Sequence, residues 1–423
     1  MAFTDLLLTG PGEFSLAYLA QSDLTTPAAG TFVAVDCLLP IPSWDVETGS
    51  DPKSSGQRGA RAKTSVGRKI GTLPIRAEMP GQVTAFDASS GAPVPAGAWS
   101  WVDDTIGGNA TGAYAAGDVD TGSAANSVVH TASTLTVGCA YAYGASDSTI
   151  SCIGWVESVS TVTATLRHDM RAIPASGDNV YPLYTMFTTS GQPTPNTFKL
   201  MGDSANHDMW MHGGILESVS LSLDNGGRLW GDFTHKIYAG SDQGTTGALL
   251  PIISRQQISE YSGRGKAHLV IASAHGIGTQ DDGTADDEGI CGTSNHTISI
   301  TWPHALVECP GATERIGAVK VRAPEVTISF DVEASPEWWD ADGEFLFDSL
   351  FQTQTPFDWA LSMGADSGSL FAATAPALLV NSRPTMSEKD GRVVYTVEAS
   401  PGVYSGDGAA TGAGQQPFAI AVG

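Results

Sequence analysis

The sequence predicts a mainly β protein, and three observations lead to this prediction. Glycine and proline are abundant (49 and 23 of 423 residues), whereas charged residues make up only 16% of the chain. That composition is typical of many short strands joined by turns. Apolar and polar residues also alternate along several short runs, which is the period of a half-buried strand. The clearest such run, residues 214–238, contains its own turn signal and is predicted to be a β-hairpin.

This predicted hairpin has one apolar and one polar face. On its first strand Val219 and Leu221 alternate with serines, and residues 224–227 (Asp-Asn-Gly-Gly) accept the φ angles of a tight turn. On its second strand Leu229, Phe233 and Ile237 alternate with polar residues. Such a hairpin must lie on a core with one face and meet water or a partner with the other.

A long polar stretch, residues 44–69, interrupts the strands near the N-terminus. It follows an irregular arm (1–30) and a strand (31–39), shows no periodicity, and is predicted to be a loop. Six of the 21 basic residues lie in it: Lys53, Arg58, Arg61, Lys63, Arg68 and Lys69. In an acidic protein this loop is either simply solvated or docks on an acidic surface, such as a neighbouring copy of the chain.

Strand-like segments continue to residue 240, and residues 1–240 are predicted to form a first β unit. A strand over 70–79 precedes a short helix over 98–106, which Gly107 and Gly108 close. Further strands are predicted at 134–143, 149–156, 162–167, 181–189 and 197–201.

Residues 241–295 are expected to form a connector or insertion with one apolar segment, 267–273. Its acidic stretch 281–288 has the carboxylate density of a calcium loop but not the spacing, so a solvated turn and a bound cation both stay open.

Residues 296–402 repeat the order of parts seen in the first unit. Strands are predicted at 297–307, 314–333, 355–363, 369–380 and 392–399, with a short amphipathic helix over 341–351. In both units a polar segment, a strand and a helix precede a turn of the Asn/Asp-Gly-Arg kind. The order predicts two tandem β-sandwich or barrel units with one short helix each, although chance similarity between β proteins is an alternative. The Gly/Ala-rich residues 403–423 are predicted to be a flexible tail.

Charge and cysteine content narrow the classes of function. A net charge of −24 argues against binding nucleic acid by neutralising phosphates. Five cysteines, without a CxxC pair or a signal peptide, are expected to be reduced thiols in a protein made in the cytoplasm. No apolar run reaches the length of a membrane span, so no membrane association is expected.

No residue pattern predicts an enzyme, a cofactor or a metal. Asp203, Ser204 and His207 are adjacent in sequence, whereas a catalytic triad is assembled from separate segments, and Ala205 stands where the serine-protease motif has glycine. His207 and His212 have no accompanying ligand pair. A hydrolase around Ser204 stays an alternative for experiment to exclude.

The order of parts resembles the tail tube (major tail) proteins of phages with long, non-contractile tails. The features are a polar loop (45–69) before a strand ending Pro-Ile-Arg-Ala-Glu, a small helix, and residues 213–229, which are similar to that family's Gly-x-x-(Val/Leu)-x-Ser strand and turn. Residues 296–402 look like a second copy of the same fold. The chain is longer than a single-copy tube protein, which duplication explains, and 241–295 has no counterpart.

The resemblance implies a structural virion protein without enzymatic activity, assembled in the host cytoplasm. Stacked rings would form a tube that conducts double-stranded DNA, closed edge to edge into a large β-barrel. A duplicated chain needs half as many subunits, so a trimer with pseudo-sixfold symmetry is expected, with a hexamer as the alternative. The tape measure protein and DNA would pass without specific binding, and tail terminator and distal tail proteins would cap the ends.

Two sets of residues are assigned roles in that tube. The six basic residues of 44–69 are candidates for contacts between rings. An acidic lumen would repel DNA, and Asp232, Asp331 and Glu333 on polar strand faces are the candidates to line it. The competing interpretation is a carbohydrate-binding, adhesin-like tail protein with Trp338 and Trp339 as its sugar platform.

Overall fold

A computed structural model gives the fold, and the prediction of a mainly β protein is confirmed. The residues that it describes are 14–24, 26–50, 64–79, 97–111, 118–131, 135–146, 149–168, 170, 172–188, 193–202, 208–223, 228–244, 268–273, 293–309, 316–334, 338–339, 343–364, 368–389, 391–404 and 416–423.

The central element is a continuous run of eight antiparallel strands, here called the long sheet. Its hydrogen-bonded order is β3-β4-β14-β13-β16-β19-β23-β22. The predicted hairpin, β13 and β14, lies in the middle of this order, so its alternation is explained by a core on one side only. The strands are β3 (Ser43–Ser50), β4 (Thr64–Glu78), β13 (Asp208–Leu223), β14 (Leu229–Gly244), β16 (Thr293–Thr301), β19 (Glu325–Glu333), β22 (Thr385–Lys389) and β23 (Arg392–Pro401).

A second run of strands is joined to the long sheet where β21 pairs with the end of β23. Its order is β15-β20-β21-β24-β11-β5, again antiparallel throughout. A third group, β12-β1-β2, extends from the first half of β13. The strands are β1 (Phe14–Ala20), β2 (Val33–Val35), β5 (Gly107–Thr111), β11 (Tyr184–Thr188), β12 (Asn196–Gly202), β15 (His268–Ser273), β20 (Phe357–Met363), β21 (Phe371–Val380) and β24 (Ala419–Val422).

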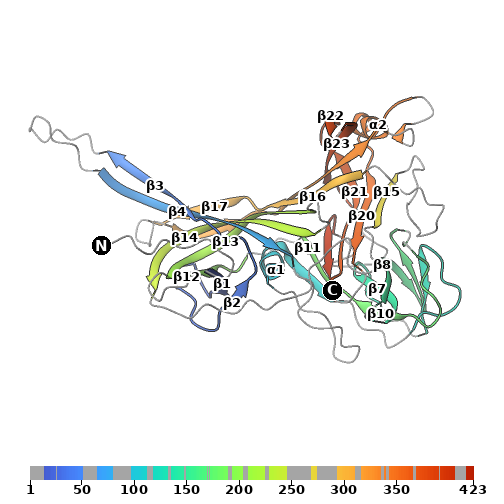
Figure 1. The fold of residues 1–423 in the computed structure, drawn as a ribbon, viewed down its shortest axis with the longest axis horizontal. Coiled ribbons are helices and arrows are strands. Elements are labelled where there is room, and N and C mark those ends of the chain that lie inside the picture. Colours follow the sequence, from blue (N-terminus) through green and yellow to red (C-terminus); the bar gives the residue numbers. More distant parts are fainter. Residues whose placement is uncertain are drawn as a thin grey trace, which may run out of the picture.

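A five-stranded module is inserted between β5 and β11. Its order is β10-β7-β8-β9-β6, and its core includes residues of β21 and β24, so it packs on the second run of strands. It lies at the opposite end of the molecule from the β3–β4 hairpin (Figure 1). The strands are β6 (Ser127–Val129), β7 (Ala140–Ser146), β8 (Thr149–Ser160), β9 (Thr163–Leu166) and β10 (Asn179–Pro182); a separate hairpin pairs β17 (His304–Glu308) with β18 (Ile316–Val321).

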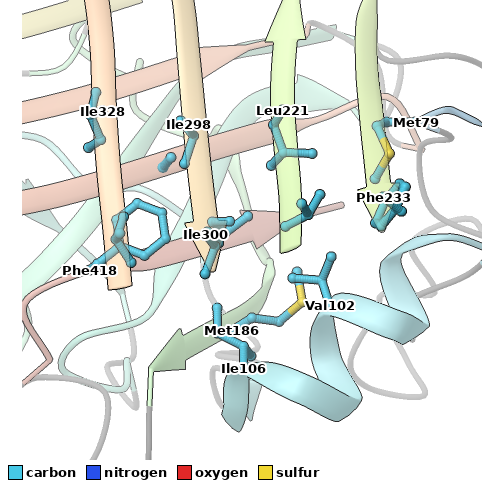
Figure 2. Close-up of a cluster of buried hydrophobic side chains, with 14 of the residues drawn as sticks. Met79, Val102, Ile106, Met186, Leu221, Phe233, Ile298, Ile300, Ile328 and Phe418 are labelled. Atoms are coloured by element: carbon cyan, nitrogen blue, oxygen red, sulfur yellow. The ribbon is translucent and has the colours of Figure 1, made fainter. Parts of the chain in front are cut away.

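Two short helices cover the apolar face of the long sheet. Helix α1 (Trp99–Ile106) buries Trp101, whose ring lies 5.2 Å from that of Phe233 and 5.7 Å from that of Phe198. Val102 and Ile106 of α1 face the long sheet and β11 (Figure 2). Helix α2 (Leu346–Thr353) buries Phe347 in the same way, 5.6 Å from the ring of Phe330.

The polar stretch 44–69 differs from the predicted loop. Residues 43–50 and 64–72 pair as the strands β3 and β4, and they form a long hairpin that projects from the body (Figure 1). The missing alternation hid these strands, because a hairpin that extends beyond the core has no apolar face to bury. Its tip, 51–63, lies outside the described residues.

The predicted flexible tail 403–423 also differs from the structure. Its last residues form β24, which is buried and pairs with β21 on one side and β11 on the other. The four apolar residues Ala419–Val422 lack alternation because both of their faces are covered.

Replacing Trp101 by alanine should destabilise the fold by about 3–5 kcal/mol, because a fully buried indole leaves a cavity that its neighbours only partly fill. The matched control is Trp339→Ala, whose side chain is 39% exposed and should cost about 1 kcal/mol. Denaturant unfolding of both variants measures the difference. Equal losses would contradict the assigned core.

His235 predicts a dependence of stability on pH. It is fully buried between Trp101 and Phe198, and burial, with a smaller contribution from His304, lowers its pKa to about 3. As the pH falls, His235 is therefore protonated near pH 6.5 in the unfolded chain but only near pH 3 in the folded chain. Its contribution to the free energy of unfolding is complete above pH 6.5 and is lost as the pH falls towards 3.

The test compares the wild type with His235→Phe in denaturant unfolding at pH 7 and pH 5. The wild type should lose about 2 kcal/mol more than the variant over that interval. The difference between the two proteins isolates His235 from Asp104, where burial and Asp103 raise the pKa to about 6 and act in the opposite direction. Parallel pH profiles would be incompatible with a buried neutral His235.

Candidate functional site

The surface of interest is the polar face of the long sheet, the face opposite α1 and the core. In its middle, β13 and β16 place hydroxyl groups side by side: Ser218 opposite Thr301, Ser220 opposite Ser299 and Ser222 opposite Thr297. The hydroxyl oxygens of Ser220 and Ser299 are 3.4 Å apart. On β19, Thr327 and Ser329 continue the same rows. The centre of the polar face is therefore uncharged and rich in hydroxyl groups.

Ion pairs flank this hydroxyl-lined centre. Of the six ion pairs among the described residues, five join neighbouring segments across the polar face and one lies elsewhere. The five are Arg76–Asp232 (3.8 Å), Arg228–Glu78 (3.1 Å), Lys236–Glu217 (3.5 Å), Lys389–Asp331 and Arg392–Glu333. Each described cation of this face thus has a carboxylate partner.

Asp331 is the most buried of these carboxylates, with 2% of its side chain exposed. It accepts hydrogen bonds from Lys389, from the Thr396 hydroxyl at 2.6 Å and from the Asn295 amide at 2.6 Å. Burial acts to raise the pKa of Asp331, but these hydrogen bonds outweigh it and hold the pKa below its ordinary value. The group is therefore a structural anion that ties β19 to β22 and β23.

The two outermost strands of the long sheet, β3 and β22, are its open edges. Among the described strands, β3 pairs only with β4 and β22 only with β23. Exposed apolar side chains lie at both edges. Near β22, Met386 is 64% and Val393 is 46% exposed; just before β3, Leu38 is 56% and Ile41 is 73% exposed. Unpaired edges with exposed apolar residues are typical of sites where another strand adds.

The predicted site residues have mixed outcomes. Asp232 and Glu333 lie on the polar face as expected, each beside an arginine. Asp331 is on the same face but is buried, and three hydrogen-bond donors surround it, so its charge is not exposed in the single chain. Lys53, Arg58, Arg61 and Lys63 lie outside the described residues, and Arg68 and Lys69 are placed only as backbone of β4.

The other candidate sites gain little support. Ser204, His207 and the acidic stretch 281–288 lie outside the described residues. Trp338 is only 2% exposed and belongs to the core, so it cannot form a sugar platform with Trp339. Within the described ranges no group of side chains is arranged to hold a metal ion.

The sequence alone did not predict the ion pairs of the polar face, although it holds a signal for one of them. The hairpin turn sets the register of β13 against β14, with Ser218 opposite Thr234, and so brings Glu217 close to Lys236. The pairs between β4 and β14 or between β19 and β22 join segments far apart in sequence, and no local pattern encodes that pairing.

Comparison with known proteins adds no family assignment. No protein-family model matches the chain, and no curated protein sequence matches it. Neither of the helices in the described ranges is long and apolar enough to cross a membrane.

Asp331→Ala should destabilise the protein by about 2–3 kcal/mol, because it removes a buried carboxylate and leaves Lys389, Thr396 and Asn295 without their acceptor. Asp232→Ala removes an exposed pair on the same face and should cost less than about 1 kcal/mol. Thermal unfolding of the two variants at neutral pH provides the comparison. A loss in Asp232→Ala as large as in Asp331→Ala would refute the structural role of Asp331.

Proposed function

We propose that this chain is the subunit of a phage tail tube, in which stacked rings enclose a lumen that conducts double-stranded DNA. The proposal takes up the resemblance of the sequence to tail tube proteins. The observation that carries it is a repeat in the strand order of the long sheet.

The long sheet divides into two halves with the same internal order. The spatial orders are β3-β4-β14-β13 and β16-β19-β23-β22. In each half two paired strands are followed by a hairpin, and the hairpin strand that comes later in the sequence (β14 or β23) is the one that pairs with them. All pairs are antiparallel, so the strand directions repeat as well. A helix and a strand pair follow the second strand in both halves, α1 with β5 and β11, then α2 with β20 and β21. This agreement supports the predicted duplication.

The contact between the halves suggests how copies would join. Within the chain, β13 of the first half pairs with β16 of the second over Ser218–Ser222 and Thr297–Thr301. Here the last strand of one half pairs with the first strand of the next half, and in the same way β22 of one copy would pair with β3 of the next copy. Because the strand directions of the two halves are the same, that contact would also be antiparallel. Ring closure removes both open edges and satisfies their backbone groups. With two units in each chain, three copies give pseudo-sixfold symmetry, and six remain the alternative.

The side chains at the edges fit such a contact. In the internal junction Val219, Leu221, Ile298 and Ile300 are all buried on the core face. Met386 of β22 occupies the corresponding edge and stays 64% exposed in a single chain. A neighbouring strand would cover it, as β16 covers the residues of β13.

In the proposed ring the polar face lines the lumen, since both helices pack on the opposite, apolar face of the long sheet. The tape measure protein and DNA would pass along this face, and tail terminator and distal tail proteins would meet the ends of the tube in the virion. The basic residues of the β3–β4 hairpin remain the candidates for contacts between rings.

The deciding experiment is negative-stain electron microscopy of the purified chain, together with light scattering. Rings or tubes with a central hole and a mass of three chains are expected. A chain that stays monomeric at high concentration would count against self-assembly through the open edges and would favour a binding module instead.

Met386→Lys should abolish ring formation without unfolding the subunit, because a lysine on an open strand edge opposes the addition of another strand. Val403→Lys is the control: it adds the same charge at a residue that is 99% exposed and outside the open edges. Light scattering and circular dichroism measure assembly and folding. Rings formed equally well by both variants would rule out β22 as the joining edge.

A further inference from the structure

Three of the five paired cations of the polar face share an arrangement. In three of the five ion pairs the carboxylate is much less exposed than its cation: 17% for Glu78 against 52% for Arg228, 2% for Asp331 against 45% for Lys389, and 35% for Glu333 against 68% for Arg392. In these three pairs the cation is the outer member, whereas in the Lys236–Glu217 pair the carboxylate is slightly more exposed, 33% against 25%. In the Arg76–Asp232 pair both side chains are 47% exposed, and Arg76 also lies over the ring of Trp230 at 5.1 Å.

We propose that the polar face is a non-retaining track for duplex DNA, in which each cation is available to a passing phosphate but is already neutralised by a carboxylate on a neighbouring strand or segment. This inference rests on the proposed function, since it requires the polar face to line the lumen. It replaces the expectation of a uniformly acidic wall by a wall of balanced pairs around hydroxyl groups.

Elementary electrostatics explains why the pairing matters. An unpaired arginine or lysine binds DNA phosphate by releasing counterions, and each such contact adds to an affinity that would hold the DNA in place. A cation and a carboxylate within about 4 Å form a pair without net charge, and salt screens the remaining dipole field within about a Debye length. The exposed carboxylates Glu325 and Glu398 then leave the face slightly repulsive, and its hydroxyl groups add no positive charge that could release counterions from DNA.

The chain offers a matched control for this idea. The sixth ion pair, Arg383–Asp348 at 2.8 Å, joins helix α2 to the segment before β22 and does not lie on the polar face. Asp348→Asn and Asp232→Asn therefore make the same change in net charge, and each removes the carboxylate beside one arginine. Only Asp232→Asn does so on the face that is proposed to meet DNA.

The experiment uses assembled rings or short tubes of the full chain, confirmed by electron microscopy, in wild-type, Asp232→Asn, Glu333→Gln and Asp348→Asn forms. Each is mixed with linear or with closed circular duplex DNA, and retained DNA is measured by sedimentation. Linear DNA can thread a ring, whereas closed circular DNA cannot.

The wild type and Asp348→Asn should retain neither DNA. Asp232→Asn and Glu333→Gln should retain linear DNA at low salt, on the order of tenfold more than the wild type. With one freed arginine per copy in a ring of three, the affinity should fall about 40-fold between roughly 50 mM and 200 mM salt.

The other outcomes overturn the proposal at different points. Rings of Asp232→Asn and Glu333→Gln that retain no more linear DNA than Asp348→Asn would refute the neutralised track while leaving the tube intact. Equal retention of linear and circular DNA would place the polar face on the outside of the ring. If the wild type forms no rings at all, the proposed function fails, and the inference fails with it.

Discussion

The backbone of an edge strand is the constraint on which this structure depends. An edge strand has a partner on one side only, so about half of its N–H and C=O groups stay unpaired. An open sheet has two such edges however many strands it contains. In the long sheet, as far as its strands are described, every strand is paired on both sides except the two outermost, β3 and β22. The strand β24 closes the gap between β21 and β11, and β13 is long enough to pair with β12 along one half and β16 along the other. The proposed function depends on these two open edges of the long sheet.

The same constraint gives the polar face its character. When a strand is paired on both sides, its side chains point only to the two faces of the sheet. The side chains on one face pack in the core and must be apolar. Polar and charged side chains are therefore confined to the other face. There, short hydroxyl side chains occupy the centre, and the charges on either side are balanced across neighbouring strands or segments rather than along one strand.

Much of the fold could be predicted from the sequence wherever one face of an element was buried. The alternation in 214–238 predicted β13 and β14, and the helical spacing of Phe347 and Leu350 predicted α2. The prediction was wrong where that condition fails. The β3–β4 hairpin extends beyond the core and has no alternation, and β24 is covered on both faces. The pairing partners of Asp331 could not be predicted, because Lys389 and Asn295 approach it through tertiary pairing across 58 and 36 residues.

The inserted module has a mechanical consequence. It is attached between β5 and β11, yet its core is completed by Leu370, Ala372, Ala419 and Ala421 from the other half of the chain. Together with the β13–β16 ladder and the bridging strand β24, it makes a third connection between the two halves. The module and β24 strengthen one joint and the β13–β16 pairing forms another, so hinging between the halves would have to break both. Each chain therefore behaves as one stiff block, and any bending of an assembly built from it has to occur at the contacts between copies.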